Sequence, residues 1–242
     1  MTERLFVADP MLREASATVL ASGPEGVVLD RTPFYARAGG QPGDAGVLRW
    51  DGGEMTVVET LKGEGEAIRH MPSDAAPLPP PGARVIATLD WPRRWAHMRM
   101  HTALHLLCAV LPGAAVTGGQ VGADRSRLDF DLPDPPAREA IEAGLNALIA
   151  ADYPVTAAWV DESVLDESPA LVRTLSVKPP RGTGRLRLLR IGTDDAPIDL
   201  QPCGGTHVAH TGAIGPVRVL KMESKGRQNR RIVVALAEAA QA

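Results

Sequence analysis

The pattern of apolar residues changes near residue 90, and this change constrains the fold more than any other feature of the chain. Before it, short apolar runs such as GVVLD, AGVLRW, MTVVETL and ARVIATLD are separated by clusters of Gly, Pro and Asp. Such a pattern is typical of short strands joined by tight turns, as in a small barrel or sandwich. After it, RRWAHMRMHTALHLLCAVL extends for about five helical turns. We therefore expect a β-barrel domain over residues 1–90 and a second domain over residues 91–242.

The second domain combines helices and strands. Asp90 and Pro92 predict the start of the first helix, and Pro112-Gly113 predicts its end. A second helix is expected from Asp134 as its cap, with Pro135 in its first turn. Expected strands are RLDFDL (127–132), VTAAWV (155–160), RLRLLRI (185–191), PVRVLKM (216–222) and RIVVALA (231–237). The predicted class is α+β: a small barrel followed by a two-layer α/β domain with a mostly antiparallel sheet.

The composition excludes several classes of protein. Hydrophobic residues make up 44% of the chain and charged residues 23%, as in an ordinary soluble domain. No run of eighteen apolar residues could span a membrane, and Glu3 and Asp9 interrupt any apolar stretch of a secretory signal. We therefore expect a cytoplasmic protein in which Cys108 and Cys203 form no structural disulfide.

Charge is unevenly distributed along the chain. The net charge is −3, which argues against a nucleic-acid binder. Yet the span 173–231 holds twelve Lys or Arg and four acids. For each of these residues taken alone, a solvated surface position is the better interpretation. The excess as a whole is compatible with a phosphate-rich partner.

Two short motifs carry potential metal ligands. HTALH places His101 and His105 at positions i and i+4, so both imidazoles lie on one helix face. CGGTH contributes Cys203 and His207. Either pair alone is weak support for a site, but the two pairs together supply three nitrogens and one sulfur. This set suits tetrahedral Zn²⁺ better than Mg²⁺ or Ca²⁺, which prefer oxygen. We predict one Zn²⁺ per chain.

Other residues near these motifs compete for the same role. His97 lies one turn before the first motif, too far along the axis from His105 to share its ion, so we interpret it as a surface residue or as a neighbour of a ligand. Cys108 is expected to be a buried apolar side chain, and His210 a neighbour of the site. A zinc protease would need Glu at the position of Thr102 as its general base, and the chain lacks that base.

A third motif lies in the first domain, in DRTPFYARAGGQPGDAG (30–46). Gly39 and Gly40 allow the backbone to approach a ligand closely, and Gln41 places an amide at the tip of a turn. The alternative is an ordinary hairpin loop, since Gly-Gly and Pro-Gly are turn signals in any protein.

Taken together, HTALH, CGGTH, TPFYARAGGQPGDAG, DRSRLDF (124–130) and GRQNRRIVVAL (226–236) resemble the AlaX family. These freestanding proteins are similar to the editing domain of alanyl-tRNA synthetase and, more distantly, to that of threonyl-tRNA synthetase. The resemblance covers nearly the whole chain. It implies a barrel of the translation-factor type joined to an editing domain. It also implies hydrolysis of mischarged tRNA(Ala), chiefly the seryl and then the glycyl ester, without ATP.

The resemblance also implies roles for individual residues. His101, His105, Cys203 and His207 stand where the family's zinc ligands stand. Thr32 matches a threonine that helps to recognise the serine side chain, and Gln41 a glutamine near the reacting ester. Two positions depart from the family pattern. His97 stands where an apolar residue is usual, and Ala38 stands where the family often has a third glycine, so the resemblance does not fix the path of this loop.

Within this interpretation, Arg227, Arg230 and Arg231 are candidates for contacts to tRNA phosphates. Asp199, four residues before the cysteine, is a candidate partner for a ligating histidine. We expect a monomer. Two alternatives stay open: editing of another mischarged tRNA, or a non-catalytic RNA-binding module in which zinc only stabilises the fold. Zinc could either activate water or position the substrate.

Overall fold

The structure is a computed structural model that describes residues 1–175, 182 and 184–238. It divides into two compact units, Met1–His97 and Met98–Ala242, and the division falls within one long helix. The predicted domains, 1–90 and 91–242, differ from these units by the first two turns of that helix. The two units are described separately below.

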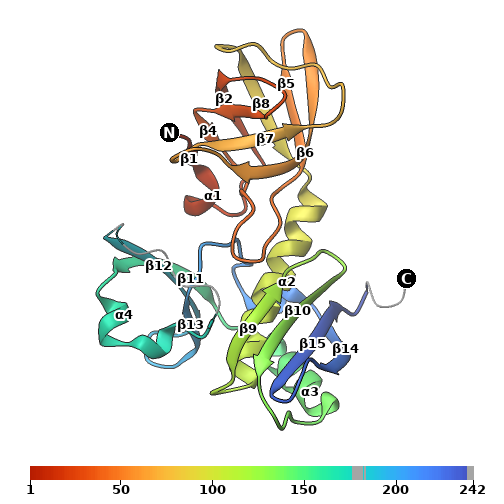
Figure 1. The fold of residues 1–242 in the computed structure, drawn as a ribbon, viewed down its shortest axis with the longest axis vertical. Coiled ribbons are helices and arrows are strands. Elements are labelled where there is room, and N and C mark those ends of the chain that lie inside the picture. The colour runs from red at the N-terminus through yellow and green to blue at the C-terminus, as the bar shows by residue number, and fades with distance from the viewer. Residues whose placement is uncertain (176–181, 183, 239–242) are drawn as a thin grey trace. The chain divides into compact units, whose positions relative to one another are not determined.

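The first unit is built on a closed six-stranded barrel (Figure 1). Its strands are, in spatial order, β2 (Glu14–Ala21), β3 (Val27–Leu29), β7 (Ile68–Pro72), β6 (Gly53–Lys62), β5 (Gly46–Trp50) and β8 (Arg84–Leu89). Every pairing between these strands is antiparallel. The barrel predicted from the short apolar runs is therefore confirmed.

Alternation along the strands explains why the barrel has one core. In β8, Val85, Ala87 and Leu89 are buried while Arg84 and Ile86 are exposed. Successive side chains of a strand point to opposite faces, so the apolar set lines the interior. Beside the barrel, β1 (Glu3–Arg4) leads into the short helix α1 (Leu5–Ala8) and pairs in parallel with β4 (Arg31–Thr32).

Helix α2 (Trp91–Val110) begins and ends where the sequence predicts. The backbone N–H of Arg93 donates to the Asp90 carboxylate at 3.2 Å, which satisfies one of the unpaired donors of the first turn. The helix stops just before Gly113, whose φ is 80°, a conformation that glycine adopts without strain. Within the described part of the chain, no helix is both long and apolar enough to cross a membrane.

The strands of the second unit form two separate antiparallel sheets. The larger has the order β14-β15-β10-β9, and the smaller the order β11-β12-β13. The bounds are β9 (Ala115–Gln120), β10 (Arg125–Asp131), β11 (Val155–Asp161), β12 (Arg185–Gly192), β13 (Pro197–Pro202), β14 (Val217–Ser224) and β15 (Asn229–Leu236). All five predicted strands are present, and the α+β class is confirmed. The division into two sheets was not predicted.

Helix α3 (Arg138–Ala150) begins later than expected. The prediction that Asp134 caps this helix is wrong, because Ala137 occupies the N-cap and no side chain caps it. Two consecutive prolines, Pro135 and Pro136, explain the delay, since the residue before a proline is disfavoured in the helical conformation. Helix α4 (Val164–Glu167) and the 3₁₀ turns η1 (Pro169–Leu171) and η2 (Thr211–Ile214) complete the unit.

Candidate metal centre

Four side chains from two distant segments of the second unit meet at one point. His101 and His105 come from α2, and Cys203 and His207 from the loop that follows β13. One potential ligand atom from each lies within 4.8 Å of those of all the others. The three histidines are buried and the cysteine is partly buried. The structure thus brings together the four residues that the two motifs singled out.

Two of the six separations between these atoms have the values expected around a tetrahedral ion. The sulfur of Cys203 lies 3.3 Å from Nε2 of His207 and 3.6 Å from Nε2 of His101. In a tetrahedral zinc site with bonds of about 2.0–2.3 Å, neighbouring ligand atoms are about 3.3–3.6 Å apart. The four residues could therefore hold a metal ion with little rearrangement.

Backbone and side-chain contacts hold the cysteine loop in place. The guanidinium of Arg187, on β12, donates to the carbonyl oxygens of Cys203 at 2.8 Å and Gly205 at 3.0 Å. The Cys203 N–H donates in return to the carbonyl of Arg187 at 3.1 Å. The N–H of Gly205 points at the sulfur, 3.4 Å away. The loop is thus tied to β12 on both sides of the cysteine, a contact that the sequence did not reveal.

A carboxylate orients one of the histidines. Nδ1 of His105 donates to Asp199 at 2.7 Å, which leaves its Nε2 facing the cluster. The amide of Gln201 donates to the other carboxylate oxygen at 2.8 Å. This carboxylate–histidine arrangement commonly accompanies metal-bound imidazoles. The expected contact between Asp199 and a candidate ligand is confirmed.

The hydroxyl of Thr102 orients a second histidine, His207. The Thr102 hydroxyl donates to the carbonyl of Met98 at 2.8 Å, so its oxygen acts as an acceptor towards other groups. That oxygen lies 3.2 Å from Nδ1 of His207 and 3.3 Å from the N–H of Val208. His207 therefore carries its proton on Nδ1 and presents bare Nε2 to the cluster. The sequence distinguishes Thr102 only as a residue that is not Glu, and gives no sign of this contact.

Protonation in the ion-free cluster is set by burial and by the neighbouring charges. Burial opposes the thiolate of Cys203, but His101 and His207 outweigh it and hold the pKa of the thiol well below its usual range. Burial, with His101 nearby, lowers the pKa of His207 to about 3, so this imidazole is neutral. Burial also disfavours charge on His105, but hydrogen bonds to Asp199 and Cys203 raise its pKa to about 10. A metal ion bound to Nε2 of His105 would therefore have to displace a proton from that ring.

The three competing residues lie outside the group of four. His97 is 2% exposed, so the interpretation of it as a surface residue is wrong. Cys108 is buried as expected, and burial raises the pKa of its thiol to about 12. The side chain of His210 is 56% exposed and lies 4.0 Å from Asp152. Both cysteines are free thiols.

In the first unit, the Gly-Gly-Gln motif forms a tight two-residue hairpin. Ala38 and Gln41 exchange backbone hydrogen bonds of 2.9 and 3.2 Å. Between them, Gly39 has φ of 55° and Gly40 has φ of 83°. Two successive positive φ angles define the turn type that favours glycine at both positions. Gln41 closes the turn and is fully buried, so the prediction that its amide lies at the tip of the turn is wrong.

Thr32 is also fully buried, and its hydroxyl is bonded to His70. Burial lowers the pKa of His70 to about 4, so the ring is neutral. Its Nδ1 donates to the carbonyl of Val27 at 2.9 Å, which leaves Nε2 as an acceptor for the Thr32 hydroxyl at 2.8 Å. The threonine oxygen accepts the N–H of Phe34 at 3.1 Å. Thr32 is thus fixed as an acceptor towards any further group.

A buried ion pair anchors the segment that contains these residues. Arg94 of α2 and Asp44 form a salt bridge in which both side chains are at most 1% exposed. The same guanidinium donates to the carbonyls of Pro33 at 2.7 Å and Pro10 at 3.0 Å. Asp44 also accepts the N–H of Tyr35 at 2.6 Å. The pair therefore holds both ends of segment 33–44.

The candidate phosphate-binding arginines differ in their surroundings. Arg231 is paired with Asp129 through two hydrogen bonds of 2.7 and 2.8 Å. Arg230 donates to the carbonyl of Pro133 at 2.7 Å and to other atoms of its own hairpin. Arg227 is exposed at the β14–β15 turn. Two further residues of the basic span, Lys178 and Arg181, lie outside the described residues.

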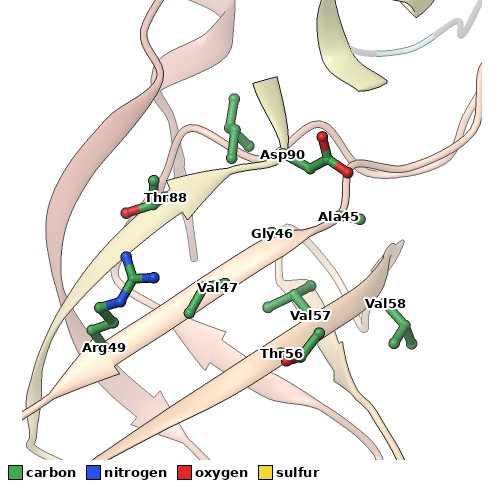
Figure 2. A pocket seen from close by; sticks show the side chains of 10 residues that line it. Ala45, Gly46, Val47, Arg49, Thr56, Val57, Val58, Thr88 and Asp90 are labelled. Atoms are coloured by element: carbon green, nitrogen blue, oxygen red, sulfur yellow. The ribbon is translucent and has the colours of Figure 1, made fainter. Parts of the chain in front are cut away.

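The barrel also carries a pocket of about 500 Å³ formed by β5, β6, β8 and the residues next to them (Figure 2). It is lined by Ala45, Gly46, Val47, Arg49, Thr56, Val57, Val58, Thr88, Leu89 and Asp90. None of the predicted site residues is among them, so the pocket does not coincide with the candidate site.

Comparison with known families agrees with this architecture. Residues 186–233 match the family described as "Threonyl and Alanyl tRNA synthetase second additional domain". Residues 6–93 match the family described as "tRNA synthetases class II (A)". The chain thus belongs to the broad class of proteins that share domains with these synthetases.

Individual relatives show to which family within this class the chain belongs. The alanyl-tRNA editing protein AlaX-M of Methanosarcina acetivorans is 37% identical over 98% of this chain and 99% of its own length. AlaX-L of Pyrococcus horikoshii is 35% identical over 96% of this chain and 57% of its length. The alanine–tRNA ligase of Pyrobaculum arsenaticum is 37% identical over 92% of this chain but only 25% of its own length. The chain belongs to the AlaX family of alanyl-tRNA editing proteins.

Proposed function

We propose that this protein is a zinc-dependent hydrolase that removes the wrong amino acid from mischarged tRNA(Ala), chiefly serine and also glycine. The observation that carries the proposal is the buried group of His101, His105, Cys203 and His207, found in a chain whose relatives are named alanyl-tRNA editing proteins. The donor set of three imidazoles and one thiolate is the chemistry that zinc prefers. Editing needs no ATP in this proposal, and the protein acts as a monomer.

Bound zinc would supply a Lewis acid that positions a substrate group or a water molecule beside the ester. The chain's own residues act around it. Asp199 and Thr102 hold two imidazoles with Nε2 towards the ion. Arg187 fixes the carbonyls of the cysteine loop. These contacts keep the ligand atoms in place without a contribution from the substrate.

Discrimination of serine from alanine rests on Thr32 in this proposal. The two amino acids differ by one hydroxyl, which an apolar synthetic pocket rejects only weakly, so a second selective step is needed. Because the Thr32 proton is given to His70, its oxygen can accept the proton of a serine hydroxyl. Thr32 is fully buried, so a substrate reaches it only when the neighbouring segment moves. Gly39 and Gly40 let the backbone approach the substrate, and Gln41 lies near the ester.

The deciding experiment is deacylation of seryl-tRNA(Ala) and alanyl-tRNA(Ala), measured with wild-type protein and with Cys203→Ala. We expect the wild type to cleave the seryl ester and spare the alanyl ester, and the variant to cleave neither. Metal content is measured in both proteins. A metal-loaded, folded wild type that leaves the seryl ester intact would overturn the proposal. Cleavage of seryl-tRNA(Thr) in place of seryl-tRNA(Ala) would reassign the substrate to another mischarged tRNA.

One observation favours a second candidate function, a non-catalytic RNA-binding module. All four donors of the candidate centre come from the protein, and such closed sites are usually structural. In that case Cys203→Ala would unfold the second unit, and neither the wild type nor the variant would cleave the ester. A thermal melt of the variant separates the two functions, because a catalytic centre can be lost with the fold intact.

A further inference from the structure

Trp159 differs from the other aromatic side chains of the molecule. The chain has three Phe, two Tyr and four Trp, and all nine lie within the described residues. Trp159 is 49% exposed, whereas the other eight are buried or half-buried. Trp159 therefore offers to solvent an aromatic surface on which another flat ring could stack.

The ring belongs to the face of the small sheet that adjoins the candidate metal centre. Trp159 on β11 is directly opposite Arg187 on β12 in an antiparallel pair. Residues opposite one another in such a pair project from the same face, about 5 Å apart at Cβ. The side chain of Arg187 reaches the carbonyls of Cys203 and Gly205. Trp159 is therefore one cross-strand neighbour away from the residue that holds the cysteine loop.

On the opposite face of this sheet, β12 is already covered. Leu186 and Leu188 are buried there with Leu165 of α4, and Val160 and Leu171 pack against them. On the face of Trp159, Leu189 of β12 is 1% exposed and is therefore covered. The edge strand β11 is exposed from Thr156 to Trp159, and Arg185 on β12 is exposed as well.

The charge beside the ring is suited to a polyanion. Arg185 and Arg187 project from the same face as Trp159, with Asp161 as the acidic residue of that row. The Arg185 guanidinium lies 3.5 Å from the carbonyl oxygen of Trp159. An exposed aromatic ring flanked by arginines is the arrangement on which unpaired nucleotide bases stack while their phosphates meet positive charge.

We propose that Trp159 is a stacking platform for an unpaired base at the 3′ end of the tRNA substrate. The inference rests on the proposed function, because the ester to be cleaved is carried by the 3′-terminal nucleotide. A base that stacks on Trp159 fixes the end of the strand beside the cysteine loop and so positions the ester. Trp159 is a positioning residue, and it leaves the chemistry at the metal centre unchanged.

The test compares Trp159→Ala and Trp159→Phe with wild type, and Ile86→Ala serves as the control because it truncates a 40% exposed apolar residue on the barrel. Two ligands are used: a tRNA(Ala) transcript with its unpaired 3′ nucleotides, and the same transcript without them. We expect Trp159→Ala to weaken binding of the complete transcript about tenfold or more. Trp159→Phe should retain most of the affinity, and the shortened transcript should not distinguish the proteins.

Two further measurements separate positioning from structure. In deacylation of seryl-tRNA(Ala), Trp159→Ala should raise KM with little change in kcat, and zinc content and melting temperature should match wild type. Binding of the complete transcript should quench tryptophan emission in wild type, and Trp159→Phe should remove that quenching while it still binds.

Each outcome has a separate meaning. If wild type edits seryl-tRNA(Ala) and Trp159→Ala does so with unchanged KM, the stacking platform is overturned and the proposed function stands. If wild type does not edit, the proposed function falls first. If Trp159→Ala alters the oligomeric state in sedimentation and leaves RNA binding unchanged, the ring contacts a second copy of the chain, and the platform is again overturned.

Discussion

Asp199 and His105 are joined by a 2.7 Å hydrogen bond although 94 residues separate them in the chain. The bond fixes which nitrogen of the imidazole faces the candidate metal centre. It also places a negative charge behind that ring, which makes the opposite nitrogen a better donor. Hydrogen bonds made to the far side of a candidate ligand thus control the position and the basicity of the atom that would bind the ion.

Asp199→Asn should weaken zinc binding about 10- to 100-fold, because the amide keeps the shape of the carboxylate but loses its charge. Competitive titration against a chromophoric chelator measures the change. Asp194→Asn is the matched control, since the Asp194 side chain is 83% exposed and its salt bridge with Arg190 lies at the surface. Equal affinities of the two variants would show that the carboxylate does not support the centre.

Thr102→Val should also weaken zinc binding, about tenfold, because His207 loses the acceptor for its Nδ1 proton while the volume stays the same. Thr102→Ser restores the hydroxyl and should return most of the affinity. The same chelator competition serves as the assay. Failure of the serine variant to recover would indicate that the methyl group, not the hydroxyl, is required.

Zinc affinity should rise with pH, about tenfold per unit near neutrality. The pKa of His105 is raised to about 10, so in the metal-free protein this ring is protonated at neutral pH and the ion must displace one proton. Cys203 has a lowered pKa and is already a thiolate, and His207, with a pKa of about 3, is already neutral. Calorimetry in buffers of different ionisation enthalpy counts the protons released. Release of at least one proton is expected, and release of none would contradict this assignment.

Arg94→Met should destabilise the first unit by about 3–5 kcal/mol, because it leaves the Asp44 carboxylate buried without its partner. Arg49→Met is the control: its salt bridge with Glu54 is about half exposed, and its loss should cost about 1 kcal/mol or less. Urea unfolding of each variant gives both values. Similar losses in the two variants would mean that burial of the Arg94 pair has no special effect.

Arg227→Gln should weaken tRNA binding and lower the slope of its salt dependence by about one. Arg227 is exposed at the turn, so its replacement should leave the melting temperature unchanged. Arg231→Gln is an informative contrast, because it breaks the pair with Asp129 and should lower stability as well. A salt slope that is identical in wild type and Arg227→Gln would exclude a phosphate contact at this residue.

The candidate ligands could be found from the sequence because their geometry is local and their chemistry is distinctive. The i, i+4 spacing of His101 and His105 fixes one helix face, and CGGTH supplies the complementary donors. The supporting contacts could not be found in this way. Arg187 reaches Cys203 only because β12 and β13 are paired, and Thr102 meets His207 only because two distant segments pack together. The residue types alone do not indicate which distant segments will be in contact.

The fold shows the same division between local and tertiary information. The strand β8 and the boundaries of α2 follow from local sequence, and both were predicted. The start of α3 was misplaced because the cap preference of Asp134 competes with the backbone restriction of two prolines, and the restriction prevails. The separation of the second unit into two sheets depends on which strands pair with one another. The periodicity of apolar residues within a strand does not predict its partner.

The two halves of the candidate metal centre enter the growing chain about a hundred residues apart. A nascent chain that has emerged as far as β12 can already have α2, yet it lacks Cys203 and His207. Tight metal capture must therefore wait until almost the whole second unit is available, and closing so long a loop is a slow, late step. If a coloured ion such as Co²⁺ is used in place of zinc, the appearance of its absorbance would report when the second unit has folded.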